Sequence, residues 1–213
     1  IWDDGNRVVN RQFTGASTDA WENGGTVNNV IFNTHVADGI AISAGGSATH
    51  TISFSSSGTD SCILVFLAVS AQTDTDGGGD AMALNGSDIS ISYAGTALNQ
   101  RTNDSRSSPF HMWSLAAADN TAGTNNLILT NTNSDSVAMT DGIICIVNVL
   151  GTSHGGTEGD DIEDSTGNSV TLSATTSGRL TIGATYTNAG GTIAPGSGVT
   201  ELATFEDSAG SGN

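Results

Sequence analysis

Two nearly unbroken apolar runs dominate the hydrophobic pattern of the chain. The first spans residues 62–69, and the second spans residues 143–150 with Asn148 as its only polar member. Both runs are shorter than the roughly 20 residues that a helix needs to cross a bilayer, and both are rich in residues that suit a pleated sheet. The pattern therefore predicts two central β-strands, each covered on both faces.

Shorter apolar runs lie on either side of these two, separated by segments of Gly, Ser, Thr, Asn and Asp that are typical of turns between strands. Residues 88–93 alternate most cleanly between apolar and polar positions, and Ala94-Gly95 separates them from residues 96–99. We therefore expect a hairpin over residues 88–99. The other expected strands are residues 27–32, 39–43, 48–54, 111–115, 127–130, 170–173, 180–186 and 198–202.

The composition favours a single all-β domain. The chain has 213 residues, with 28 glycines and only two prolines, and it offers little material for helices. We expect an N-terminal arm over residues 1–26, a β-sandwich domain over residues 27–207 and a flexible small-residue tail over residues 208–213.

The charge balance excludes two classes of partner. The formal net charge is −17, and all five of the basic Lys and Arg positions are arginine. A phosphate backbone or an anionic membrane surface would be repelled, so we expect neither nucleic acid nor membrane as a partner. An acidic surface that stays soluble in salt indicates an extracellular location. A virion-surface location is what the resemblance described below implies.

Two acidic segments are candidate calcium loops. Asp74, Asp76 and Asp80 lie in a glycine-rich segment, spaced as carboxylates are in loops that wrap a hard cation. The later bidentate Glu of an EF-hand is missing, so that motif is excluded. A second, weaker candidate is the denser carboxylate cluster formed by Glu158, Asp160, Asp161, Glu163 and Asp164.

The alternative for both segments is that they are solvated acidic loops, as such loops usually are in a strongly acidic chain. The four histidines, at positions 35, 50, 111 and 154, show no zinc-ligand spacing with one another or with cysteine. Calcium is therefore the one cofactor that the sequence leaves open.

The two cysteines, Cys62 and Cys145, fall in the two central apolar runs. We expect them on neighbouring or facing strands of the core, where they would form a disulfide in an oxidising compartment. The alternative is a pair of buried free thiols, which are common in apolar strands.

The first 26 residues differ from the rest of the chain. They contain two of the three tryptophans and two of the five arginines, with little regular alternation. Exposed Trp and Arg are typical interface anchors, so one hypothesis is that this arm packs on a neighbouring subunit. The alternative is an N-terminal strand that lies on its own domain. The candidate interface residues are Trp2, Arg7, Val8, Val9, Arg11, Phe13 and Trp21.

The order of the strands and turns resembles a known module. The segments that carry the resemblance are residues 62–69, 89–98, 112–115, 127–130, 145–151, 178–182 and 195–202. Together they look like the jelly-roll-like β-sandwich module of tailed-phage structural proteins and secreted bacterial surface proteins, over roughly residues 48–202. The resemblance implies a jelly-roll-like antiparallel β-sandwich with a structural or binding role.

The sequence departs from that module at its C-terminal end. In the module a further pair of strands follows the region of Glu201-Leu202, whereas this sequence stops at Asn213. We therefore expect an open sheet edge that a strand from elsewhere would fill, with the N-terminal arm as the obvious donor.

No catalytic site can be assembled from the serines, histidines and carboxylates of the sequence, so we expect a non-enzymatic protein. The leading hypothesis is a self-associating subunit of a phage particle, such as a head-decoration or tail-associated protein, that contacts its own copies and other structural proteins of the particle. Two alternatives stay open. One is an extracellular filament subunit assembled by strand donation; the other is a carbohydrate-binding adhesive module, for which 5% aromatic residues provide little binding platform.

Overall fold

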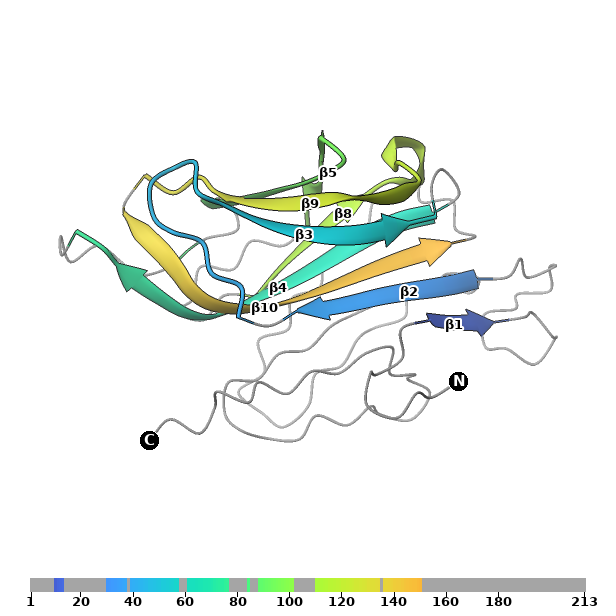
Figure 1. Ribbon diagram of the computed structural model, residues 1–213, viewed down its shortest axis with the longest axis horizontal. Helices are drawn as coiled ribbons and strands as arrows, with labels where there is room; N and C mark the ends of the chain where they lie inside the picture. Colours follow the sequence, from blue (N-terminus) through green and yellow to red (C-terminus); the bar gives the residue numbers. More distant parts are fainter. Residues whose placement is uncertain are drawn as a thin grey trace, which may run out of the picture.

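The computed structural model describes residues 10–13, 30–37, 39–57, 61–76, 84, 88–101, 110–134 and 136–150. Within these ranges two antiparallel β-sheets pack face to face as a sandwich (Figure 1). The six-stranded sheet, sheet A, has the order β1 (Asn10–Phe13), β2 (Val30–Ala37), β10 (Val137–Leu150), β4 (Ser61–Asp74), β8 (Phe110–Leu115) and β7 (Asn99–Gln100). The four-stranded sheet, sheet B, has the order β3 (Thr49–Ser56), β9 (Gly123–Asn131), β5 (Ile89–Tyr93) and β6 (Thr96–Ala97).

Helix is scarce in this part of the chain. A single-turn 3-10 helix, η2 (Ala117–Asp119), connects β8 to β9. The described ranges contain no helix with the length and apolar character needed to span a membrane.

The chain crosses repeatedly between the two sheets. The strands β2, β4, β8 and β10 lie in sheet A, while β3, β5 and β9, which fall between them in the sequence, lie in sheet B. As a result, β10 is inserted between β2 and β4, and β9 is inserted between β3 and β5. This is the strand order of a jelly roll, so the predicted fold class, an all-β jelly-roll-like antiparallel sandwich, is confirmed.

The two apolar runs form the centre of sheet A, as predicted. The strands β4 and β10 pair along their whole length, from Ser61 opposite Leu150 to Asp74 opposite Val137. Both strands extend well beyond the apolar runs, because the ladder of backbone hydrogen bonds continues through polar residues. The register shifts twice, between Met139 and Asp141 and between Asp141 and Gly142, so the β4–β10 pair is locally irregular there.

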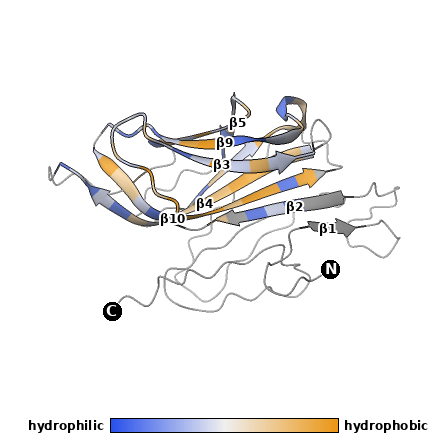
Figure 2. Ribbon diagram, in the orientation of Figure 1, coloured by the Kyte–Doolittle hydropathy of each residue, from blue (hydrophilic) through white to orange (hydrophobic). Residues whose placement is uncertain are grey.

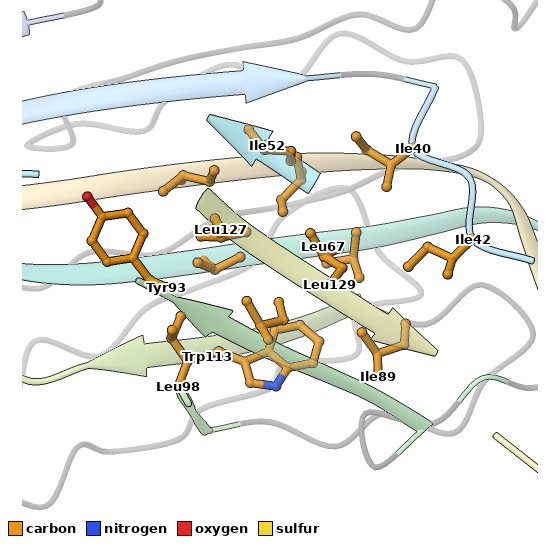
Figure 3. Packing of buried hydrophobic residues seen from close by; sticks show 14 of the residues in the cluster. Ile40, Ile42, Ile52, Leu67, Ile89, Tyr93, Leu98, Trp113, Leu127 and Leu129 are labelled. Atoms are coloured by element: carbon orange, nitrogen blue, oxygen red, sulfur yellow. The ribbon is translucent and has the colours of Figure 1, made fainter. Parts of the chain in front are cut away.

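The core fills the space between the two sheets with side chains from alternate strand positions. Trp113 and Tyr93 are its largest members, and Leu67, Leu127 and Leu129 pack among them (Figure 3). Each of these side chains is at most 1% exposed. Burying one such side chain contributes roughly 1.5 to 3 kcal/mol, so this layer is the main source of stability.

The predicted hairpin is present, but its second arm divides between the sheets. Ala94 and Gly95 both have positive φ angles, 50° and 84°, as a tight two-residue hairpin turn requires. After this turn, β6 stays in sheet B beside β5, whereas β7 pairs with β8 in sheet A. Leu98, between β6 and β7, is buried at the crossing point.

Several of the described strands differ in their bounds from the prediction. The strand expected at 27–32 is β2, which runs from Val30 to Ala37, because polar residues in its second half pair with β10. The segment 39–43 forms only one bridge, from Ile42 to Met139, and contributes Ile40 and Ile42 to the core instead of a full strand. The strand expected at 127–130 begins earlier, at Gly123. The strands expected at 170–173, 180–186 and 198–202, and the tail at 208–213, lie outside the described residues.

Candidate functional site

The first candidate calcium loop begins where β4 ends. The Asp74 carboxylate accepts a hydrogen bond of 3.0 Å from the backbone N–H of Asp76, which closes a tight turn. Thr75 donates from both its N–H and its hydroxyl to the Ser136 carbonyl, at 3.0 and 2.7 Å. The structure thus places Asp74 and Asp76 side by side at the end of the β4–β10 pair.

The remaining calcium candidates, Asp80 and the cluster Glu158, Asp160, Asp161, Glu163 and Asp164, lie outside the described residues. Among the residues that are described, no three His, Cys, Asp or Glu side chains gather as a metal-binding group. Calcium binding by either loop therefore stays a prediction.

The two cysteines lie on neighbouring strands, as predicted, but their positions exclude a disulfide. Cys62 on β4 is opposite Val149, and Cys145 on β10 is opposite Phe66, so the two are offset by four residues along the strands. At about 3.3 Å per residue this offset is roughly 13 Å, beyond the roughly 7 Å limit between bridged Cα atoms. Neither cysteine forms a disulfide, and burial raises the pKa of the Cys145 thiol to about 11.

Two of the candidate interface residues lie in an edge strand of their own domain. Arg11 and Phe13 belong to β1, which pairs antiparallel with β2 of the same chain, with Arg11 opposite Phe32 and Phe13 opposite Val30. Backbone pairing to β2 therefore holds Asn10–Phe13 against its own chain. The packing of the arm on a neighbouring subunit stays a prediction. The other candidates, Trp2, Arg7, Val8, Val9 and Trp21, lie outside the described residues.

The sequence also contains one serine pattern, Gly151-Thr152-Ser153-His154-Gly155, directly after β10. It matches the Gly-x-Ser-x-Gly spacing of a nucleophile elbow, in which a strand turns sharply into a helix at the top of an α/β sheet. The strand before this pattern instead lies antiparallel between β2 and β4 of a sandwich. The match therefore lacks the strand context of that motif, and its serine lies outside the described residues.

A buried polar cluster closes one end of the sandwich. The Asn120 amide donates to the hydroxyls of Ser56 and Ser61, at 2.6 and 2.9 Å, and to the Ser61 carbonyl at 2.8 Å. The Asn148 amide donates to the same Ser61 hydroxyl at 2.9 Å and to the Cys62 carbonyl at 3.0 Å, and its oxygen accepts from the Ser57 N–H at 3.0 Å.

This cluster joins both sheets where the chain passes from β3 to β4. Ser56 belongs to sheet B, and Ser61 and Asn148 belong to sheet A. A second buried amide, Asn131, donates to the carbonyls of Ser43 and Val137 at 3.1 and 2.8 Å. These side-chain amides form hydrogen bonds with backbone groups that have no partner in the strand ladders. We therefore assign them a structural role. The sequence gives only one hint of the first cluster, the single Asn within the second apolar run.

The outward positions of sheet B form an uncharged surface, which we call the hydroxyl face. Along β3 every second residue is exposed, and the residues between them are buried or half-buried. The same alternation on β5 and β9 leaves only Ser, Thr, one Asn and one Ile pointing outward. The members of the hydroxyl face are Thr49, Thr51, Ser53, Ser55, Ser90, Ser92, Thr124, Asn126, Ile128 and Thr130.

The strand register aligns these side chains in rows. Thr49, Thr130 and Ser90 lie opposite one another across β3, β9 and β5. At the other end of the face, the hydroxyls of Ser55 and Thr124 share a hydrogen bond of 2.6 Å. Neighbouring strands are about 4.8 Å apart and successive rows about 7 Å apart, so the face is a regular array of donors and acceptors.

The array carries no Asp, Glu, Lys or Arg on β3, β5 or β9, all of which are described in full. The chain as a whole has 22 acidic residues and a net charge of −17. In comparisons with known proteins, no family model and no curated protein matches the chain.

Proposed function

We propose that the chain is a non-enzymatic structural subunit of a self-assembling particle, of the kind found on the virion surface of tailed phages as head-decoration or tail-associated proteins. The observation that carries this proposal is the hydroxyl face, an uncharged surface on a strongly acidic protein. The phage setting comes from the resemblance in strand order described above.

Electrostatics favours the hydroxyl face as the contact surface. Two copies with a net charge of −17 repel each other, and the repulsion between two unit charges 4 Å apart is about 1 kcal/mol even in bulk water. A contact through a face without carboxylates keeps the charges of the two copies apart. Salt lowers the remaining repulsion, because the Debye length is about 8 Å at physiological ionic strength.

The chemistry of the face also suits a protein contact. Ser and Thr hydroxyls both donate and accept hydrogen bonds, so the rows can pair with polar groups of another subunit in either orientation. Ile128, half-buried at the centre of the row that joins Thr51 and Ser92, adds an apolar contact. The partners in this proposal are further copies of the chain and other structural proteins of the particle.

The N-terminal arm would supply the attachment in the same particle. Its Asn10–Phe13 stretch extends sheet A of its own subunit as an edge strand. In the filament alternative the arm would complete the sheet of a neighbouring subunit. The pairing of β1 within its own chain favours the other arrangement, in which the arm attaches the subunit to the particle.

The experiment compares the assembly state of three single-residue variants with that of the parent chain. Light scattering and negative-stain electron microscopy are recorded at low and high salt. Thr51→Glu and Asn126→Glu place a carboxylate on the hydroxyl face, and the matched control Thr121→Glu places the same charge on an exposed loop position outside it.

The face variants are expected to weaken self-association by about tenfold or more, because an unpaired charge buried in a contact costs several kcal/mol. The control variant should assemble like the parent chain, and assembly of the parent chain should increase with salt. Parent protein that stays monomeric at all salt concentrations, alone and with the particle's other structural proteins, would overturn the proposal. Equal assembly of the face and control variants would show that the hydroxyl face is not the contact surface.

A further inference from the structure

The strand β3 forms the longest sheet edge in the described part of the chain. Sheet B ends at β3 and β6, and sheet A ends at β1 and β7. The strands β6 and β7 have two residues each and β1 has four, whereas β3 has eight. Very short edge strands protect a sheet from pairing with another chain, and β3 lacks this protection.

The register shows which backbone groups of β3 point away from its neighbour β9. The Asn131 N–H donates to the Ala48 carbonyl at 2.9 Å, one position before the pair of Thr49 with Thr130. Hydrogen-bonded and non-hydrogen-bonded pairs alternate along an antiparallel ladder. The N–H and C=O groups of Thr49, Thr51 and Ser53 therefore point away from β9, and we call these groups the open edge.

None of the usual devices that protect an edge is present on β3. The strand contains no Pro, Asp, Glu, Lys or Arg, and its register with β9 continues from Thr49 to Ser56 without a shift. The side chains of Thr49, Thr51 and Ser53 are exposed. Figure 2 shows mostly pale colours along β3, in contrast to the strongly hydrophobic central parts of β4 and β10.

The end of β3 shows how a group outside the sheet uses such an edge. The Ser55 carbonyl, which points in the same direction as those of the open edge, accepts a hydrogen bond of 3.1 Å from the Asn33 side-chain amide. Asn33 belongs to β2 in sheet A, so the chain itself closes this end of the strand. The stretch from Thr49 to Ser53 lies before this closed end.

We propose that the open edge pairs with the open edge of a second copy of the chain, antiparallel about a two-fold axis at Thr51. Thr51 of one copy then lies opposite Thr51 of the other, and Thr49 lies opposite Ser53 on both sides. Each pair exchanges two backbone hydrogen bonds. The two four-stranded sheets become one continuous sheet, and the two hydroxyl faces become one surface.

The composition of the edge favours a second copy as the partner. The stretch is self-complementary, because a two-fold axis brings Thr and Ser opposite Thr and Ser, and such cross-strand pairs stabilise a sheet. Two chains of net charge −17 can approach here without placing carboxylates of β3 against each other. A basic strand of another protein would find no carboxylate on β3 to pair with.

This proposal deepens the self-association proposed above and rests on it, since it defines one contact between two copies. The contact is isologous and closes after two copies, so it differs from the head-to-tail contact of a filament. The pair then presents a hydroxyl face of twice the area to further partners.

The first test measures amide hydrogen exchange of the parent chain by NMR at low and high protein concentration. The amides of Thr49, Thr51 and Ser53 are expected to exchange about tenfold or more slowly in the concentrated sample, because pairing protects them. The amides of Ile52 and Phe54 face β9 and should exchange equally in both samples. Exchange of the open-edge amides that does not depend on concentration would overturn the proposal.

The second test compares three variants by analytical ultracentrifugation. Thr51→Pro removes an outward N–H without removing a bond to β9, and it should weaken the pair by about tenfold or more. The matched control Ser55→Pro changes the same strand outside the pairing stretch. Ser90→Glu alters the hydroxyl face on β5, away from the edge. Both of these variants should form the pair as the parent chain does, and circular dichroism checks that all three are folded.

The outcomes separate this proposal from the proposed function. Pairing of folded Thr51→Pro at the parent affinity would overturn the β3 contact and leave self-association through the hydroxyl face in place. Loss of the pair in Ser90→Glu but not in Thr51→Pro would assign the contact to the hydroxyl face and also overturn the β3 contact. A parent chain that stays monomeric by itself would overturn the pairing, whereas the proposed function would still stand if the chain joined the particle's other proteins.

Discussion

The hydroxyl of Tyr93 donates a hydrogen bond of 2.8 Å to the carbonyl of Gly123, the first residue of β9. The same hydroxyl lies 3.2 Å from the Phe54 carbonyl and accepts from the Asn125 amide at 3.3 Å. Tyr93 is the last residue of β5, and its ring meets that of Phe54 edge to face at 6.2 Å. One side chain therefore holds together the ends of β3, β5 and β9 in sheet B.

Tyr93→Phe tests this relationship. The substitution keeps the ring but removes the hydroxyl, so we expect a loss of about 1 to 2 kcal/mol in the free energy of unfolding, as when a buried acceptor loses its donor. Tyr93→Ala, which also empties the core position, should cost roughly 3 to 5 kcal/mol. Urea unfolding followed by Trp fluorescence measures both values, and equal losses for the two variants would contradict the assignment.

The polar cluster at the end of the sandwich should behave as one unit. Asn120 and Asn148 both donate to the Ser61 hydroxyl. We expect Asn120→Ala and Asn148→Ala each to cost about 1 to 3 kcal/mol and the double variant to cost less than their sum, because each single variant already weakens the shared network. A double-mutant cycle in urea measures the coupling; strict additivity would show that the two amides act independently.

The buried thiol of Cys145 gives the protein a pH dependence in the alkaline range. Burial raises the pKa of this thiol from 9.0 to about 11, so the folded state holds its proton more tightly than the unfolded state does. This contribution to stability is fully present below pH 9 and is lost between about pH 9 and 11, with a slope of at most about 1.4 kcal/mol per pH unit.

Cys145→Ala is expected to remove this part of the alkaline loss. Urea unfolding at pH 8, 9, 10 and 11 should give a steeper decline for the parent chain than for the variant. The other titrating groups are common to both proteins and cancel in the comparison. Parallel curves would show that the thiol does not differ between the two states. Because neither cysteine forms a disulfide, a reductant should leave the melting temperature unchanged.

Calcium binding at the end of β4 can be tested by chelation at constant ionic strength. If Asp74, Asp76 and Asp80 hold the ion, a chelator should lower the melting temperature of the parent chain, since a ligand bound only by the folded state stabilises it by mass action. Asp74→Asn keeps an acceptor for the Asp76 N–H but loses the charge, so its melting temperature should no longer respond. An unchanged melting curve of the parent chain would show that this segment is a solvated acidic loop that binds no calcium.

The central strands and the hairpin could be predicted because their signals are local. The runs 62–69 and 143–150 have the length and composition of buried strands, and Ala94-Gly95 marks a turn between alternating segments. The second half of β2 could not be predicted in the same way. Its inward Asn33 and His35 interrupt the apolar pattern, and they are accommodated by the Ser55 carbonyl at 3.1 Å and by the Phe54 ring.

The candidate site depends on the register of the paired strands, which cannot be read from the sequence alone. The offset between Cys62 and Cys145 follows from the pairing of β4 with β10, and a shift of four residues would have placed the two thiols opposite each other. Part of the hydroxyl face could be predicted from the sequence, since Thr51 and Ser53 alternate with Ile52 and Phe54. Its extension across β9 and β5 needs partners that lie far apart in the sequence.

The insertion of β10 between β2 and β4 also sets the order in which the domain can be made. During synthesis, β2 and β4 leave the ribosome long before the strand that joins them, so sheet A has no centre until Leu150 has emerged. Until then both strands carry unpaired edges, and the apolar side chains of β4 have no neighbour on one side. Folding must wait for contacts between distant parts of the sequence, so it should be slow, and a nascent chain stopped before β10 is the species most exposed to aggregation.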